Sequence, residues 1–128
     1  MNIDQLRGQI DLHLSNLVDK YCVELIEIDP QLTPVADALK DYLAEGKRFR
    51  SIFALIGYLG AGGELKPEIY RACAALEFLQ ASALIHDDLM DGSDTRRGKP
   101  AIHKQFEKLH NSKFGNSAAI LIGDLALT

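Results

Sequence analysis

Three aspartates stand close together in the sequence, after a long stretch that is mostly apolar. On a helix, Asp87 and Asp91 lie one turn apart on the same face, whereas Asp88 points about 100° away. Neighbouring carboxylates repel each other, and the partial negative charge of a helix C-terminus adds to the conflict. A divalent cation would relieve it, and oxygen ligands without cysteine or clustered histidine favour Mg²⁺ over zinc. We therefore expect Asp87 and Asp91 to bind Mg²⁺, with Asp88 as a further candidate ligand.

The acidic group also has a structural and a calcium-binding explanation. It could be a solvated helix end followed by a basic loop, and the aspartates alone do not decide against this. An EF-hand loop that began at Asp87 would need oxygen ligands at its third and twelfth positions, where Leu89 and Gly98 stand. The EF-hand explanation is therefore excluded.

A second charged group is basic. Lys47, Arg48 and Arg50 stand where a helix is expected to begin, which is an unfavourable place for cations unless an anion binds there. Lys47 and Arg50 are three residues apart and can hold one anion together. The alternative is a basic edge that packs on neighbouring acidic residues such as Glu45.

Arg96 and Arg97 form another basic pair, just after the aspartates. Arginines are the usual protein partners of a phosphate that Mg²⁺ also binds. One acidic and two basic groups in the same chain suggest Mg²⁺ and two diphosphates. Neither a Ser/His/Asp nor a Cys/His arrangement accompanies them, so nucleophilic catalysis is not indicated.

The spacing of apolar residues predicts an all-α fold, and no segment makes a convincing strand. Thr33 is expected as the N-cap of the second helix, with Pro34 at its first helical position. A polar loop and a short helix should follow the aspartates. The predicted helices span residues 3–27, 33–44, 47–59 and 67–90, the loop spans 91–100, and a last helix begins near residue 116.

Several residues are expected in the interior. The third helix is nearly all apolar, which predicts burial on most of its sides. Cys22 and Cys73 do not form a CxxC pair and are best explained as small buried hydrophobic residues in a reducing compartment. Phe106 and Phe114 are assigned to the core, and Asp124 is expected to be buried and to orient a basic residue.

Composition sets the broad class. The chain has 128 residues, enough for one domain, with 47% hydrophobic and 25% charged residues. The net charge is −4 and the sequence contains no block of like charge, so nothing suggests that the protein binds nucleic acid. No secretory signal is visible and no apolar run is long enough for a membrane span, which predicts a cytoplasmic protein. The last helical pattern has no cap before Thr128, so we expect the chain to be the N-terminal portion of a larger helical protein.

The charged motifs and their surroundings resemble the trans-isoprenyl diphosphate synthases, also called the polyprenyl synthetase family. The resemblance implies an isoprenoid-synthase-type helical bundle around a central cavity, with residues 1–128 as the N-terminal part of a single domain. It also implies a prenyltransferase that condenses isopentenyl diphosphate head-to-tail with an allylic prenyl diphosphate. The matching segments, in the family's order, are Gly46–Arg50, Glu77–Ala81, Leu84–Asp91, Asp94–Pro100 and Gly123–Asp124.

The resemblance also implies a role for individual residues. Asp87 and Asp91 would bind Mg²⁺ bridging to the allylic diphosphate, and Arg96 would hold that diphosphate as it departs. The residues implied for isopentenyl diphosphate are Lys47, Arg50, Gln80 and Arg97.

Departures from the family pattern are few. Glu45 and Ser51 stand where the family often has glycine and proline, and Ala101 where it often has threonine. The family's second aspartate-rich motif does not occur in residues 1–128, so we expect this chain alone to be inactive. Ser82 and Ala83 are small at positions where bulky aromatics block the growing product, which implies geranylgeranyl or longer products.

Two other functions compete with prenyl transfer. A non-catalytic partner subunit of a hetero-oligomeric synthase could share the fold, although such subunits can lose the charged residues that are all present here. A terpene cyclase shares the aspartates but has no use for isopentenyl diphosphate, and Lys47, Arg50 and Arg97 argue against it. The resemblance further implies a homodimer.

Overall fold

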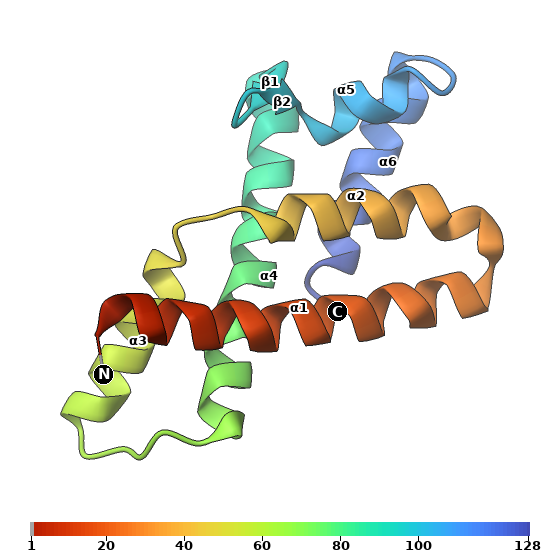
Figure 1. The fold of residues 1–128 in the computed structure, drawn as a ribbon. Helices are drawn as coiled ribbons and strands as arrows, with labels where there is room; N and C mark the ends of the chain where they lie inside the picture. The colour runs from red at the N-terminus through yellow and green to blue at the C-terminus, as the bar shows by residue number, and fades with distance from the viewer. Residues whose placement is uncertain (1) are drawn as a thin grey trace. The chain divides into compact units, whose positions relative to one another are not determined.

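The computed structural model describes residues 2–128, whose regular secondary structure is almost all helical, as predicted (Figure 1). A 3₁₀ turn, η1 (Pro30–Leu32), joins the first two helices, and two short strands, β1 (Thr95–Arg96) and β2 (Lys99–Pro100), form a hairpin. In residues 2–128, no helix is both long enough and apolar enough to cross a bilayer. The helices are α1 (Ile3–Ile28), α2 (Thr33–Ala44), α3 (Phe49–Gly60), α4 (Pro67–Asp91), α5 (Ile102–Glu107) and α6 (Ser112–Leu125).

The chain divides into two compact units, and the division falls within α4, between Phe78 and Leu79. In the first unit, α1 and α2 run antiparallel on either side of η1 (Figure 1). The amphipathic pattern of α1 gives it one buried face, which packs with α3 and the first half of α4. The cluster that joins these helices contains Leu6, Ile10, Ile52, Leu55, Tyr70 and Cys73.

The first two helices begin in different ways, α1 with a capping box and α2 without a side-chain cap. The Asn2 side chain accepts from the Gln5 amide (2.9 Å) and the Gln5 side chain accepts from the Asn2 amide (3.0 Å), which is a capping box. The prediction that Thr33 caps α2 is wrong. Thr33 is already helical, because η1 leads into α2 without an extended cap residue, and its hydroxyl donates to the Pro30 carbonyl oxygen instead (2.7 Å).

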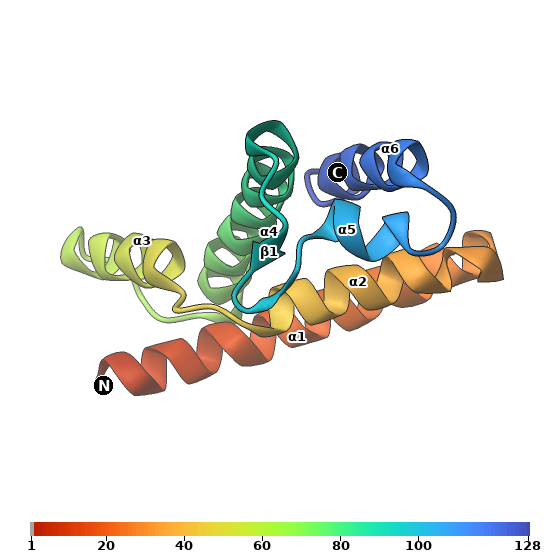
Figure 2. The same cartoon turned by 90° about the horizontal axis from the view of Figure 1, so that it is seen from above.

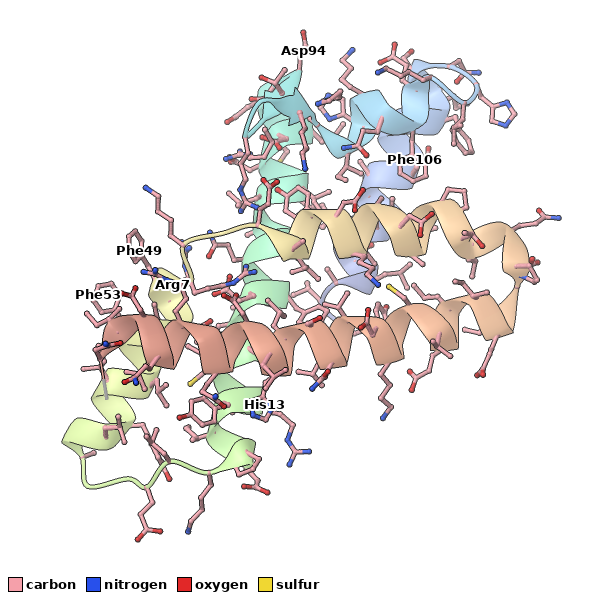
Figure 3. The ribbon with its side chains drawn as sticks, in the orientation of Figure 1. Arg7, His13, Phe49, Phe53, Asp94 and Phe106 are labelled. Carbon is pink, nitrogen blue, oxygen red and sulfur yellow. The ribbon has the colours of Figure 1, made fainter. Side chains whose placement is uncertain are left out.

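The prediction that α3 is buried on most sides is also wrong. Its buried residues are Ser51, Ile52 and Leu55, which lie along one stripe. Phe49 and Phe53 lie on another side and are 55% and 70% exposed, with ring centroids 6.3 Å apart (Figure 3). The apolar sequence therefore predicted this helix correctly, but it did not predict which of its sides are buried within residues 2–128.

The two cysteines are buried, as predicted. Cys22 lies against α2, where its thiol donates to the Ala36 carbonyl oxygen (3.4 Å), and Cys73 belongs to the apolar cluster. Burial raises the pKa of both thiols. Neither is therefore suited to act as a thiolate nucleophile at neutral pH.

In the second unit, α5 lies alongside α6 (Figure 2). Phe106 is buried, as predicted, whereas Phe114 is 39% exposed and its assignment to the core was wrong. The last helix begins at Ser112, four residues before the predicted start, because the Asn111 side chain accepts from the Phe114 amide and caps it (2.9 Å). The polar loop contains the β1–β2 hairpin, which the sequence pattern did not predict.

Gly115 allows the close approach of α6 to α5. A Cβ at this position would lie 2.3 Å from the His103 carbonyl oxygen and 2.8 Å from the Glu107 amide nitrogen, both of which are backbone atoms. Gly57, in α3, has nothing within 4 Å of the equivalent point.

We expect Gly115→Ala to lower the free energy of unfolding by about 1–3 kcal/mol, because two helix backbones must move apart. Gly57→Ala, also a helical glycine, should raise it by about 0.4–1 kcal/mol. Urea unfolding followed by circular dichroism would measure both. Equal changes in the two variants would contradict the packing argument.

Candidate active site

The last turn of α4 carries all three aspartates, and a Schellman motif ends the helix immediately after them. The Ser93 amide donates to the Asp88 carbonyl oxygen (2.9 Å), and the Gly92 amide donates to that of Leu89 (3.4 Å). Gly92 has a φ of +67°, which glycine adopts without strain. No basic residue lies in this last turn, so no side chain of that turn offsets the repulsion between the aspartates and the negative end of the helix dipole.

The structure separates Asp88 from the other two aspartates. Asp88 is 1% exposed, and Arg96 Nε lies 3.2 and 3.1 Å from its two carboxylate oxygens. Arg96 Nη2 donates to Asp88 Oδ1 (2.5 Å) and is 3.9 Å from Asp87 Oδ2. Asp87 and Asp91 are exposed. Asp88 thus neutralises an arginine, and Asp87 and Asp91 remain as the pair on the accessible face.

The β1–β2 hairpin gives the paired arginines different positions. Arg96 pairs with Lys99, and the two residues between them, Arg97 and Gly98, have φ values of +52° and +75°. A type I′ turn needs positive φ at both central positions, and glycine at the second is its usual signal. Arg97 is consequently exposed at the tip, while the Arg96 side chain is only 30% exposed and turns to Asp88.

The donor set suits Mg²⁺ that is shared with a ligand. In residues 2–128, no group of three or more His, Cys, Asp or Glu side chains is arranged to hold a metal. Two carboxylates, Asp87 and Asp91, are too few for an all-protein calcium or zinc site. They match the way Mg²⁺ is usually bound, by one or two carboxylates together with substrate phosphates and water.

His86 connects α4 to α6 next to the aspartates. Its Nδ1 donates to the Ser82 carbonyl oxygen (2.8 Å), and its Nε2 lies 3.3 Å from Asp124 Oδ1. The expectation that Asp124 is buried is wrong, since its side chain is 66% exposed. Gly123 makes room for the imidazole, because a Cβ there would lie 2.4 Å from a ring carbon.

The basic group lies in the first unit and is also divided. Lys47 and Arg50 are exposed, and Lys47 Nζ lies 5.8 Å from the centroid of the Phe49 ring. Arg48 between them is 5% exposed, and its φ of +56° is rare for a residue other than glycine. The N-terminus of α3 has no side-chain cap, so its first amides can bind an anion together with the two exposed cations.

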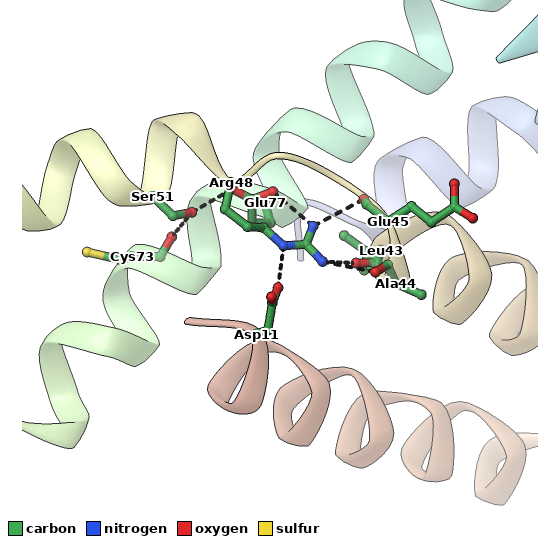
Figure 4. A network of polar contacts seen from close by, with 8 residues as sticks. All are labelled: Asp11, Leu43, Ala44, Glu45, Arg48, Ser51, Cys73 and Glu77. Atoms are coloured by element: carbon green, nitrogen blue, oxygen red, sulfur yellow. Dashed lines mark hydrogen bonds and ion pairs between the residues drawn. The ribbon is translucent and has the colours of Figure 1, made fainter. Parts of the chain in front are cut away.

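A buried network holds Arg48 in place (Figure 4). Its guanidinium donates to Asp11 Oδ1 (2.7 Å) and Glu77 Oε2 (3.2 Å), which belong to α1 and α4. Three further bonds go to backbone carbonyl oxygens after or at the end of α2. These acceptors are Leu43 (2.8 Å), Ala44 (3.2 Å) and Glu45 (3.2 Å).

Ser51 completes this network. Its hydroxyl is fully buried and donates to the Cys73 carbonyl oxygen (2.9 Å) or to Glu77 Oε1 (2.5 Å). Sequence reasoning treated Ser51 only as a departure from proline, named Glu77 only as part of a matching segment, and missed Asp11. A buried glutamate such as Glu77, in an apolar helical segment, was the available signal, because it requires a partner.

Gln80 lies in α4, seven residues before Asp87, and is half-buried. That spacing corresponds to about two turns, or roughly 10 Å along the same helix face. Gln80, the aspartates, Arg96 and Arg97 thus all belong to the second unit, whereas Lys47 and Arg50 belong to the first.

The fold and the residue pattern together define an all-helical protein with acidic and basic groups suited to Mg²⁺ and diphosphates. The profile of the polyprenyl synthetase family matches residues 33–128. The chain is 36% identical over 120 residues to a short chain isoprenyl diphosphate synthase of Methanocaldococcus jannaschii, covering 93% of this chain and 34% of that protein. It therefore belongs to the polyprenyl synthetase family.

Other relatives agree. An octaprenyl diphosphate synthase of Haemophilus influenzae is 30% identical over 131 residues, which cover 100% of this chain and 36% of that protein. A crystal structure of geranylgeranyl pyrophosphate synthase from Corynebacterium glutamicum, complexed with isoprenyl diphosphate and magnesium, superimposes with a TM-score of 0.90 at 34% identity, covering 99% of this chain and 40% of that one. The all-α isoprenoid synthase fold is thereby confirmed. The chain spans roughly a third of the length of the curated relatives described here.

We expect Asp88→Asn to lower the free energy of unfolding by about 2 kcal/mol. The substitution weakens the charge-assisted bonds to Arg96 and leaves that arginine without a full counter-charge. Asp87→Asn, on the exposed face, should change it by less than about 0.5 kcal/mol. Urea unfolding would measure both. A larger effect of Asp87→Asn would contradict the division of roles between these aspartates.

Proposed function

We propose that the intact protein is a Mg²⁺-dependent prenyltransferase that joins isopentenyl diphosphate head-to-tail to an allylic prenyl diphosphate. The observation that carries the proposal is the division of the acidic group, in which Asp87 and Asp91 are exposed on one face while Asp88 is occupied with Arg96. Membership of the polyprenyl synthetase family supports the reaction class.

In this proposal, the aspartate face binds the allylic substrate. Mg²⁺ on Asp87 and Asp91 would supply Lewis-acid stabilisation of the charge that builds on the departing diphosphate. Arg96, held by Asp88, would donate to the same diphosphate and add a fixed positive charge. Breaking the allylic C–O bond would release the diphosphate and leave an allylic cation. The double bond of isopentenyl diphosphate would attack this cation, and the product cation would lose a proton to the released diphosphate.

Lys47, Arg50, Gln80 and Arg97 are proposed to bind isopentenyl diphosphate. Each is at least partly exposed, and three of them are cations. A terpene cyclase would not need these cations, so they favour condensation over cyclisation. A non-catalytic partner subunit remains the alternative of a different class, and it predicts that Mg²⁺ and substrates leave no turnover. We further propose a cytoplasmic homodimer, as the family resemblance implies.

The test is incorporation of labelled isopentenyl diphosphate into prenyl products by the intact gene product. We expect turnover with Mg²⁺ and none with excess chelator. Asp91→Ala should lower kcat by about 10²-fold or more, because it removes a group that acts on transition-state charge. Asp94→Ala is the matched control, since Asp94 is exposed and close in sequence but pairs with Lys104.

Lys47→Ala should raise the KM for isopentenyl diphosphate roughly tenfold, as expected from the loss of one charge-assisted bond. Lys66→Ala, which removes an exposed lysine paired with Glu64, is its control. Full activity in chelator, or equal effects of Asp91→Ala and Asp94→Ala, would rule out the proposed reaction.

Product length is proposed to be geranylgeranyl or longer, because Ser82 and Ala83 are small. The two positions differ in the structure, since Ser82 is 3% exposed whereas Ala83 is exposed. A bulky residue at Ala83 can therefore be introduced without displacing packed atoms, and one at Ser82 cannot.

Ala83→Phe should shift the products to shorter chains and leave the unfolding temperature nearly unchanged. Chromatography of the dephosphorylated products would show the shift. Ala75→Phe is the control, because Ala75 is exposed on the same helix but about 80° away around its axis. Unchanged products from Ala83→Phe would show that another position sets the chain length.

A further inference from the structure

We infer that Arg48 is a positioning residue, whose buried network sets the geometry of the isopentenyl diphosphate site without touching the substrate. The inference rests on the proposed function, in which Lys47 and Arg50 bind that diphosphate. The contacts of the Arg48 side chain all lie within the first unit (Figure 4).

Arg48 has no donor left for a ligand. A guanidinium has five N–H donors, and the structure gives it five acceptors, two on carboxylates and three on backbone carbonyls. Its side chain is 4% exposed. Of the three cations in this motif, Arg48 therefore contributes to the structure, and Lys47 and Arg50 carry the exposed charge.

The five acceptors of Arg48 come from three different helices and the residue after α2. Three are carbonyl oxygens of Leu43, Ala44 and Glu45, so the side chain caps the end of α2 from beyond it. The carboxylates of Asp11 and Glu77 tie the same side chain to α1 and α4. A planar fork with fixed donor directions is required to meet these acceptors together, and a lysine ammonium cannot do so.

The buried Arg48 side chain also fixes the backbone on either side of it. Arg48 has a left-handed φ of +56°, and it immediately precedes α3. Lys47 comes directly before Arg48, and Arg50 lies in the first turn of α3 two residues after it. Because Arg48 is fixed from three helices, both neighbours emerge from a rigid support, which reduces the ordering needed when they bind a diphosphate.

Glu77 is itself held in place. Its Oε2 accepts from Arg48, and its Oε1 contacts the fully buried Ser51 hydroxyl, which lies one residue beyond Arg50. Ser51 therefore links the first turn of α3 to the same carboxylate that holds Arg48. The two exposed cations are thus positioned from both sides of the motif.

The test is a kinetic comparison on the intact enzyme. Arg48→Lys keeps the charge but loses the fork, and we expect it to raise the KM for isopentenyl diphosphate about tenfold while kcat and the allylic KM change less than about threefold. Arg48→Gly relieves the left-handed backbone and should raise the same KM, since the side chain is what matters. Arg71→Lys is the matched control, because Arg71 is exposed and contacts Glu68. It should change none of these three kinetic constants.

The outcomes separate this inference from the proposed function. If Lys47→Ala raises the KM for isopentenyl diphosphate but Arg48→Lys only lowers the unfolding temperature, the positioning role is wrong and the proposed function stands. If Lys47→Ala has no effect either, the proposed site itself is wrong. Should Arg48→Lys fail to fold, Asp11→Asn decides, because Asp11 is 47% exposed and its loss weakens only one contact. An unchanged KM in Asp11→Asn would then overturn the inference.

Discussion

The burial of Arg48 is the constraint on which the first unit depends. A cation removed from water is costly unless counter-charges and hydrogen-bond acceptors surround it, and here they come from α1, α4 and the end of α2. The left-handed backbone at this residue adds a cost of about 1 kcal/mol, which bonds of about 1 kcal/mol or more each offset. Three helices and the start of a fourth are therefore held in register by one side chain.

The acidic group follows the same physical logic with the charges reversed. Asp88 is buried and neutralised by Arg96, just as Arg48 is buried and neutralised by Asp11 and Glu77. In both groups the exposed charges are the neighbours of a buried one. A buried ion pair fixes the backbone, and adjacent residues of the same sign then face solvent. Asp87, for example, lies 3.9 Å from Arg96 Nη2, which contacts Asp88 much more closely. Such residues bind an incoming ion of opposite sign most readily.

The sequence was sufficient to predict the helices and the motifs. It was not sufficient to predict which residue of each motif is buried and which are exposed. Helical periodicity located α1, α2 and α4 to within about two residues, because each has a strong apolar stripe or a clear stop. It could not distinguish Arg48 from Lys47 and Arg50, since the two carboxylates that neutralise Arg48 are 37 and 29 residues away in the chain. The exposure of Phe49 and Phe53 likewise depends on tertiary packing, which periodicity does not determine.

A motif of repeated charges is therefore easily overcounted when it is interpreted as a ligand set. Three aspartates suggest three metal ligands, yet both oxygens of Asp88 already contact Arg96. Three cations suggest three phosphate contacts, yet all five donors of Arg48 already have acceptors within the protein. On a helix, consecutive residues diverge by about 100°, which lets Asp88 face inward while Asp87 and Asp91 face out. At Arg48, the left-handed backbone that precedes α3 accompanies the same division between a buried residue and its exposed neighbours. The inward member forms the buried ion pair, and the outward members are the residues proposed to bind the substrate or its Mg²⁺.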